Sequence, residues 1–472
     1  MDMTIAGAIL LTLLIALFIG RKLKSLIVVA FIVDLFFEMG YAAALGSQNL
    51  NYKQVSLDFV LVYCLLHLKD VSSNLVRPFV FLSLSYVASI IILYFYPSDA
   101  WIATTEVSWD DILFDGRMPV HPSFSMEGVK MTVRMISYLL IIVYVYSTFA
   151  VDDYKWIIKK SANVIKIFLI LGIIEFFVKN VLFMGETWGS VLEVIFGYSE
   201  DTVYEGRLRG NSYELNLFTR EASHYAYILF VCTIVLFTNN VIEKKRKISL
   251  SLLSCIFLIV FSTSFSSLLF LSGFLLFYLS YRWYILNPQS RKKEIYTFVF
   301  LVSIVAPIFT LFLGSNNDNF VGERLVNMLG NFGDFFSNDW NYGSSLGDGS
   351  SQVRIVSVIQ TLIAFTSRPF LGLSWGTAYC HGATAQFLAS VGIVGAWLWI
   401  KFYFYNCSLI GYMHIIRTPF LFAILLYLFV NLFNSLGYRP FYGLCPMFFC
   451  ISCCYVFKGP GSADGKQSYE SN

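Results

Sequence analysis

Arginine, histidine and carboxylate side chains gather in a polar stretch at residues 206–226, where an apolar segment begins. These side chains are Arg207, Arg209, Arg220, Glu221 and His224. Guanidinium groups bind phosphate through two parallel hydrogen bonds, and a carboxylate or imidazole beside them can orient or deprotonate a hydroxyl group. The stretch equally suits an ordinary helix start, in which the helix dipole favours Glu221 and Ser223 or Thr219 caps the first N–H groups. Both interpretations stay open from the residues alone.

A second polar stretch, at residues 349–382, contains a predicted amphipathic helix. Apolar residues recur at helical spacing from Val353 to Ile363, which is typical of a helix lying on a membrane surface. Pro369 and Gly372 then end the helix.

Three candidate residues lie on and after this helix: Arg354, Arg368 and His381. His381 stands just before an apolar segment that begins near Thr384, at the depth of lipid phosphates. Because an unperturbed imidazole titrates near neutral pH, His381 is a candidate general base. The alternative is that His381 is only a polar surface group.

The elements that position these stretches are membrane helices. Hydrophobic residues make up 57% of the 472 residues, charged residues only 13%, and the mean hydropathy is +0.67. Apolar blocks recur at the length needed to cross about 30 Å of hydrocarbon. We predict thirteen spans in one membrane domain covering residues 1–472, centred near residues 12, 34, 61, 87, 140, 172, 230, 256, 275, 304, 395, 428 and 449. The net charge of +3 gives no reason to expect nucleic acid as a partner.

Basic clusters orient the predicted spans. They are Arg21/Lys22/Lys24, Lys69/Arg77, Lys155/Lys159/Lys160, Lys244/Lys245/Arg246/Lys247 and Arg291/Lys292/Lys293. All fall on one side of the count, which the positive-inside bias makes cytoplasmic. The N-terminus then lies outside, and a tail at about 458–472 lies inside. Three long loops face the periplasm, at about 97–128, 185–220 and 315–382, and the cytoplasmic connections lack a Gly-rich phosphate loop.

The outside loops carry mainly arginine, including Arg439, whereas the inside loops prefer lysine. Recognition of phosphate is one physical reason to keep arginine there. The other is pairing with acids such as Glu205, Glu214 and Asp348. We favour the anion site for the group of arginines, although single arginines could serve either role.

Nine cysteines suggest no disulfide framework or metal site. Seven fall within predicted helices, whereas Cys380 is expected in a long exposed loop. We therefore expect no cysteine chemistry.

Residues 220–226 (REASHYA) resemble a motif of the O-antigen polymerase and ligase superfamily, the Wzy-type polymerases in particular. In that family a Glu-Pro-Ser stretch precedes re-entry into the membrane, and Ala222 here replaces the usual proline.

A second match resembles the large periplasmic loop of this family. In chain order its parts are Ser351, Arg354, a Pro-Phe-Leu-Gly-Leu turn with Gly376, then His381, then the Gly392 and Gly395 pair. Gly382 stands where many relatives have asparagine. The first 180 residues match by hydropathy alone.

The resemblance implies a GT-C-like glycosyltransferase in the bacterial inner membrane, with its active site facing the periplasm. The substrates would be undecaprenyl-pyrophosphate-linked oligosaccharides, a growing O-antigen chain being transferred to the next lipid-linked repeat, and a chain-length regulator is a possible partner. Arg209, Arg354 and Arg220 would hold the pyrophosphate, while His381 or Glu221 deprotonates the acceptor hydroxyl. Arginines would replace a divalent metal, so we expect a reaction without metal or other cofactor.

Two other functions remain compatible with the sequence. A ligase, which attaches finished chains to lipid A core, tends to carry an arginine in a hairpin between two spans, and residues 261–267 (FSTSFSS) contain none. A flippase or transporter would use the acids predicted within spans, which are Asp34, Glu38, Asp58 and Glu175. The lack of an internal repeat and the polar residues concentrated on one side favour the polymerase.

Overall fold

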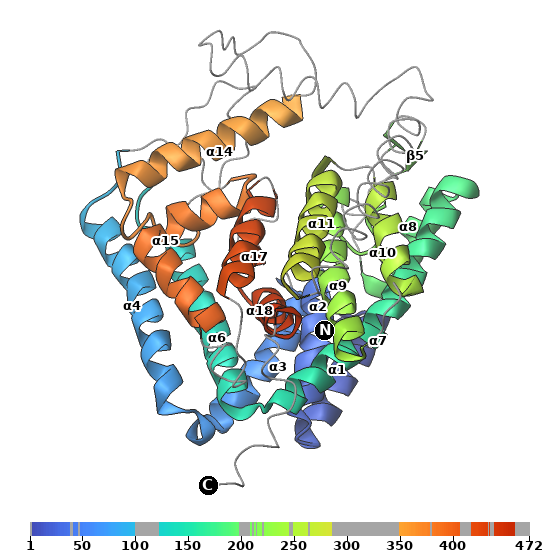
Figure 1. Cartoon of the computed structure of the whole chain (residues 1–472), viewed down its shortest axis with the longest axis horizontal. Coiled ribbons are helices and arrows are strands. Elements are labelled where there is room, and N and C mark those ends of the chain that lie inside the picture. The colour runs from blue at the N-terminus through green and yellow to red at the C-terminus, as the bar shows by residue number, and fades with distance from the viewer. Residues whose placement is uncertain are drawn as a thin grey trace.

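The computed structural model describes residues 2–37, 41–45, 48–99, 122–197, 208–209, 212–213, 215–219, 221–244, 249–262, 265–285, 349–377, 380–405, 417–432, 434 and 439–457. These residues form a bundle of α-helices with α14 lying across one end (Figure 1). Arg207, Arg220 and Glu38 lie outside the described residues.

The described helices follow in chain order. They are α1 (Ile5–Ile19), α2 (Leu23–Phe36), α3 (Tyr52–Leu66), α4 (Ser73–Phe95), α6 (Met126–Thr148), α7 (Val151–Phe176), α8 (Gly185–Phe196), α9 (Ala222–Ile242), α10 (Leu250–Phe261), α11 (Phe265–Ile285), α14 (Gly349–Ser367), α15 (Ala383–Ile400), α17 (Arg417–Val430) and α18 (Leu444–Val456). Short elements are β1 (Asp2–Met3), β2 (Ala43–Leu45), β3 (Gln48–Leu50), β4 (Leu208–Arg209), β5 (Ser212–Tyr213), the 3₁₀ turns η1 (Leu68–Asp70) and η4 (Arg439–Phe441), and the π turns η2 (Phe177–Val181) and η3 (Lys401–Tyr405).

Twelve of the thirteen predicted span centres fall inside these helices, and the one near residue 304 lies outside the described residues. Five described helices are long and apolar enough to cross a membrane: α4, α6, α7 with η2, α9, and α15 with its π-helical extension. The structure therefore supports an α-helical membrane protein. The count of thirteen spans and the GT-C-like arrangement stay predictions.

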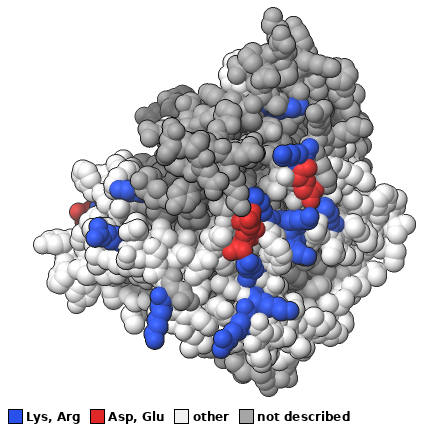
Figure 2. Space-filling model, turned by 60° about the horizontal axis from the view of Figure 1, so that its bottom comes forward, with Lys and Arg blue, Asp and Glu red and all other residues white. Residues whose placement is uncertain are grey.

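The turns between α1 and α2 and between α6 and α7 meet at one end of the bundle, which we name the basic end. Lys24 pairs with Asp153 there, and the N–H of Ser72 donates to Ser147 Oγ at 3.1 Å. Figure 2 shows lysine and arginine side chains on this face. Three basic clusters that the sequence places on one side of the membrane thus lie at one end of the fold, since Arg21, Lys69 and Lys155 adjoin these turns.

We name the opposite end of the bundle the α14 end. Segments that are distant in the sequence contact one another there. Ser98 Oγ lies 3.2 Å from Ser367 Oγ, and the N–H of Ser98 donates to the Pro122 carbonyl at 3.1 Å. β1, β2 and β3 form an antiparallel sheet beside the start of α3, where the Tyr52 hydroxyl donates to the Phe196 carbonyl.

The predicted loop at 185–220 begins with a helix that the sequence analysis did not anticipate. α8 covers Gly185–Phe196 and buries Gly189 and Leu192, while Val191 and Val194 are exposed. With 12 residues it is too short for a span, and its apolar residues merge into the preceding hydrophobic segment.

α9 forms the centre of the bundle. Every residue from Ala222 to Asn240 is buried, and the helix packs against α7, α10, α11 and α18. Because α9 is apolar on all faces, burial on all faces is its stable placement.

Candidate functional site

The backbone of His381 is fixed to the helix that carries Arg354. The N–H of His381 donates to Ser357 Oγ at 3.1 Å, and Ser357 lies three residues after Arg354 on α14. Residues three apart on a helix share a face. The structure thus brings the His381 loop against the Arg354 helix, although the Arg354 side chain is outside the described part.

α14 packs on the protein with one face and leaves part of its predicted apolar stripe exposed. Ser357, Val358, Thr361 and Ala364 are buried against the protein, whereas Ile363 is 59% exposed. Ile363 of the predicted stripe points away from the protein, and the placement of the helix on a membrane surface stays a prediction.

Cys380 is buried, so the predicted exposed loop cysteine is wrong. Its thiol is 1% exposed and packs with Val358 and Ala385. Burial raises the pKa of Cys380 to about 11, against hydrogen bonds from Thr361, Gly382 and Ser357 that lower it. The loop folds back onto α14, which the sequence pattern did not reveal.

The start of α15 is held by the end of α17. The N–H groups of Ala383 and Thr384 donate to the carbonyls of Asn434 and Asn431, at 2.9 and 3.1 Å. The first N–H groups of a helix lack intrahelical acceptors, and here the chain after α17 supplies them. A Cβ at Gly382 would lie 2.3 Å from the Leu432 carbonyl oxygen, which explains why asparagine does not fit at this position.

α15 is broken at Gly392, and the turn at residues 369–374 fills the break. Gly392 has φ +68°, and Ile393 and Val394 donate to the carbonyls of Pro369 and Phe370 at 2.7 and 3.1 Å. On the other side of the break, Leu373 and Ser374 donate to the carbonyls of Ala389 and Ser390 at 2.7 and 2.9 Å. Backbone groups freed at membrane depth are tolerated when protein satisfies them, as it does here.

The same turn positions Arg368. Its guanidinium donates to the Tyr96 carbonyl at the end of α4. Burial lowers the pKa of Arg368, and the Asp99 carboxylate opposes that shift. Arg368 therefore ties α14 to α4 at the α14 end.

Glu221 and His224 stand together at the start of α9. Glu221 is the residue before the first turn, and the Ser223 hydroxyl donates to its carboxylate at 3.0 Å. The expected capping by Ser223 or Thr219 is wrong, because the Thr219 hydroxyl donates to the carbonyls of Asn216 and Glu221 instead. His224 is 7% exposed, in the first turn of the helix.

The segment before α9 is anchored by Glu175 of α7. Both carboxylate oxygens accept the N–H of Leu217, at 3.0 and 2.9 Å, and Lys179 pairs with Glu175 at 2.8 Å. Lys179 also donates to Asn216 Oδ1 at 2.8 Å. The intramembrane acid that suggested a transport path thus holds the chain leading to Glu221.

Arg439 is buried in η4, where its guanidinium donates to the carbonyls of Asp34 and Leu35. These carbonyls belong to the last turn of α2, which has no further intrahelical donors. The Asp34 carboxylate pairs with Lys53 at 2.6 Å, and both side chains are largely buried. Arg439 and this ion pair form one charge cluster, and Lys53 is a member that the sequence analysis missed.

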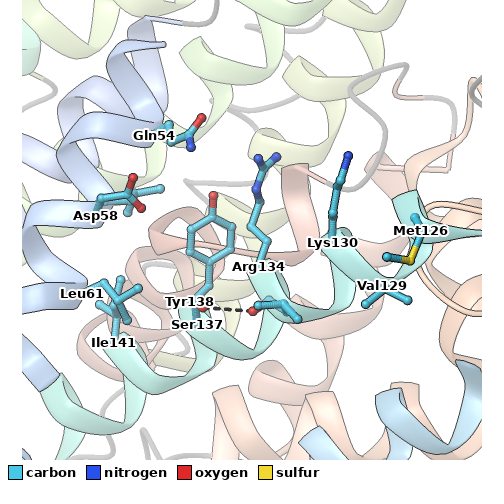
Figure 3. A pocket seen from close by; sticks show the side chains of 12 residues that line it. Gln54, Asp58, Leu61, Met126, Val129, Lys130, Arg134, Ser137, Tyr138 and Ile141 are labelled. Carbon is cyan, nitrogen blue, oxygen red and sulfur yellow. Dashed lines mark hydrogen bonds between the residues drawn. The ribbon is translucent and has the colours of Figure 1, made fainter. Parts of the chain in front are cut away.

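A cavity of about 340 Å³ lies between α3 and α6 (Figure 3). Its polar lining includes Gln54, Asp58, Lys130, Arg134 and Tyr138. Of these, only Asp58 was noted in the sequence. The sequence does contain a signal for Lys130 and Arg134, because two basic residues one helical turn apart inside an apolar segment are costly in lipid.

The candidate residues therefore fall into separate groups. His381 and Arg368 belong to the α14 and α15 region, whereas Glu221 and His224 belong to α9 and its neighbours (Figure 1). Arg209 lies in β4, and its side chain is not described. Among the described residues, no group of three or more His, Cys, Asp or Glu side chains is placed to hold a metal ion. Comparisons with protein-family models, with curated proteins and with solved structures find no match to this chain.

Proposed function

We propose that the chain is a membrane glycosyltransferase that polymerises undecaprenyl-pyrophosphate-linked repeats of O-antigen or a related surface polysaccharide. The observation that supports the proposal is the hydrogen bond from the His381 main-chain N–H to Ser357 Oγ, because Ser357 lies on the helix that also carries Arg354. A base next to a phosphate-binding cation is the arrangement that this transfer needs.

In the proposed reaction, the acceptor hydroxyl oxygen attacks the anomeric carbon of the donor sugar. The bond between that carbon and the pyrophosphate oxygen breaks, and the lipid pyrophosphate leaves with the electron pair. His381 or Glu221 takes the hydroxyl proton. Arg354, with Arg209 and Arg220, stabilises the charge that develops on the leaving group.

Two observations favour this function over its alternatives. Ser262 at the end of α10 and Ser267 in the first turn of α11 lie with their Oγ atoms 2.5 Å apart. The sequence of residues 261–267 contains no arginine, which the ligases tend to carry at this position. Of the four acids on which a transport path would rest, Asp34 and Glu175 each pair with a lysine. Asp58 lines the cavity between α3 and α6, and Glu38 lies outside the described residues. These findings count against the ligase and the flippase respectively.

The test is the glycolipid pattern of cells that lack the gene and carry it back on a plasmid. Wild-type chain should restore the polymer ladder, while Arg354→Ala and His381→Ala should each leave glycolipid with a single repeat. Arg77→Ala, an exposed arginine near the basic end, is the matched control and should restore the full ladder. Loss of all attachment would favour a ligase, and ordinary chain lengths in either variant would remove that residue from the site.

A further inference from the structure

The charged residues that line the cavity between α3 and α6 lie toward one end of it. Both helices begin at the α14 end, where Gln54, Lys130 and Asp58 lie within about two turns of the helix starts. Leu61 and Ile141 lie deeper, Ile141 about 22 Å along α6 from Met126. The three charged residues of the lining thus lie toward the α14 end, and the deepest residue of the lining is the apolar Ile141. Met126 and Val129 add apolar surface at the α14 end, and Tyr138 adds a hydroxyl group deeper in the cavity.

The charge of the lining is complementary to an anion. Lys130 and Arg134 contribute two positive charges, and Asp58 contributes one negative charge. Glu127, three residues before Lys130, lies 3.8 Å from it but outside the lining. In Figure 3 the Arg134 side chain lies between Tyr138 and Lys130 and points in nearly the same direction as that of Lys130.

A second layer of charge lies behind the wall of the cavity. The Tyr138 ring stacks on Tyr442 with centroids 5.2 Å apart, and Lys53 Nζ lies 4.4 Å from the Tyr442 ring centroid. Lys53 and Arg439 carry two positive charges and the buried Asp34 carboxylate carries one negative charge, so this cluster has a net charge of +1. The interior behind the cavity therefore reinforces its positive potential rather than cancelling it.

The cavity is open to the side, where a lipid would enter. Val133 is 59% exposed, and Val62 and Leu65 continue an exposed apolar surface along α3. Among the candidate site residues whose side chains the structure describes, His381, Glu221 and His224 do not line it. These features point to a lipid of the surrounding bilayer rather than to the reacting glycolipid.

We propose that this cavity binds one anionic glycerophospholipid from the leaflet at the α14 end. The phosphate lies against Arg134 and Lys130, and one acyl chain follows Val133 and Leu61 toward Ile141. Arginine and lysine bind phosphate oxygens with charge-assisted hydrogen bonds, while their apolar stems contact the chain. The inference does not depend on the proposed glycosyltransferase activity.

Native mass spectrometry of the full chain, released from detergent and titrated with phosphatidylglycerol, tests this site. Wild-type protein should retain one phosphatidylglycerol more tightly than phosphatidylcholine. Lys130→Gln with Arg134→Gln should weaken that binding about tenfold or more, since two charged hydrogen bonds are lost. Lys69→Gln with Arg77→Gln removes the same two charges near the basic end, where both side chains are exposed, and should leave binding unchanged.

Val133→Trp, which fills the chain-binding part and keeps both cations, provides an independent variant and should also weaken phosphatidylglycerol binding. Equal retention by the double variant and the wild type would overturn the proposal. So would full displacement by soluble glycerol phosphate, which would make this a site for free phosphate esters. Preferential retention of a polyprenyl diphosphate would assign the cavity to the glycolipid substrate instead.

Discussion

The carboxylate of Glu175 accepts the main-chain N–H of Leu217 with both of its oxygens, at 3.0 and 2.9 Å. Leu217 adopts φ +44°, a conformation that costs a non-glycine residue free energy. The buried carboxylate therefore holds a strained bend of the chain four residues before Glu221. This structural role is sufficient to account for an acid at this position within a membrane segment, without any role in transport.

Glu175→Gln should destabilise the protein by about 3 kcal/mol, because it removes the negative charge that pairs with the buried Lys179 ammonium. Unfolding of purified protein in mixed micelles measures the free energy, and hydrogen exchange at the Leu217 amide should become faster. Asp152→Asn, at the exposed ion pair that Asp152 forms with Lys155 on the same helix, is the control and should leave stability close to that of the wild type. Equal effects of the two changes would contradict the anchoring role.

Asp34→Asn and Lys53→Met should each cost about 3–5 kcal/mol, since each breaks a buried ion pair. The double change should cost less than the sum of the two, because neither charge is then left buried alone. The same unfolding measurement yields the coupling energy. Additive effects would mean that the pair does not act as a unit.

Gly392→Ala should prevent α15 from adopting its break. A Cβ at this position would lie 2.3 Å from the Phe370 carbonyl oxygen, and φ is +68°. We expect a fall in the yield of folded protein, visible by size-exclusion chromatography of detergent extracts. The neighbouring Ile393→Ala, at a side chain that is 52% exposed, should leave the yield near that of wild type. A monodisperse Gly392→Ala protein would show that the break is dispensable.

Cys380 should react slowly with maleimides at neutral pH. Its pKa of about 11 leaves about one thiol in ten thousand ionised at pH 7, and burial blocks approach of the reagent. A cysteine introduced at exposed position 363 (Ile363→Cys) should react on the order of a hundredfold faster, as peptide mass spectrometry would show. Raising the pH should increase the fraction of Cys380 present as thiolate and therefore the rate of labelling. Rapid labelling at pH 7 would contradict the packing of this loop on α14.

Transfer activity in purified protein should survive treatment with a chelator, because the proposed reaction uses arginines to stabilise the leaving pyrophosphate. Synthesis of polymer from lipid-linked repeats, with and without EDTA, is the measurement. Loss of activity that Mg²⁺ or Mn²⁺ restores would require a metal in the mechanism.

Most helices could be predicted from the sequence because span length and turn chemistry act locally. α14 was expected from its helical spacing and ends at Ser367, before Pro369. The start of α15 near Thr384 was also expected, and the helix begins at Ala383. α8 was missed because a short amphipathic helix following an apolar segment carries no distinct length signal.

Contacts between distant segments could not be predicted, since no local pattern encodes them. Ser357 appears in the sequence only as a residue of a helix, and its bond to His381 depends on how the loop folds back. The burial of Cys380 and the pairing of Asp34 with Lys53 are of the same kind. The roles assigned to Arg354, Glu221 and His381 stay predictions.

The break in α15 has a consequence for biogenesis. Residues 369–374 leave the ribosome before α15 exists, and twenty residues separate Gly372 from Gly392. At synthesis rates of about 5–20 residues per second, the earlier segment waits roughly one to four seconds for its partners. During that interval the N–H and carbonyl groups that bond to Ala389, Ser390, Ile393 and Val394 in the folded chain lack these partners. We therefore expect the segment and α15 to enter the membrane together, as one hairpin.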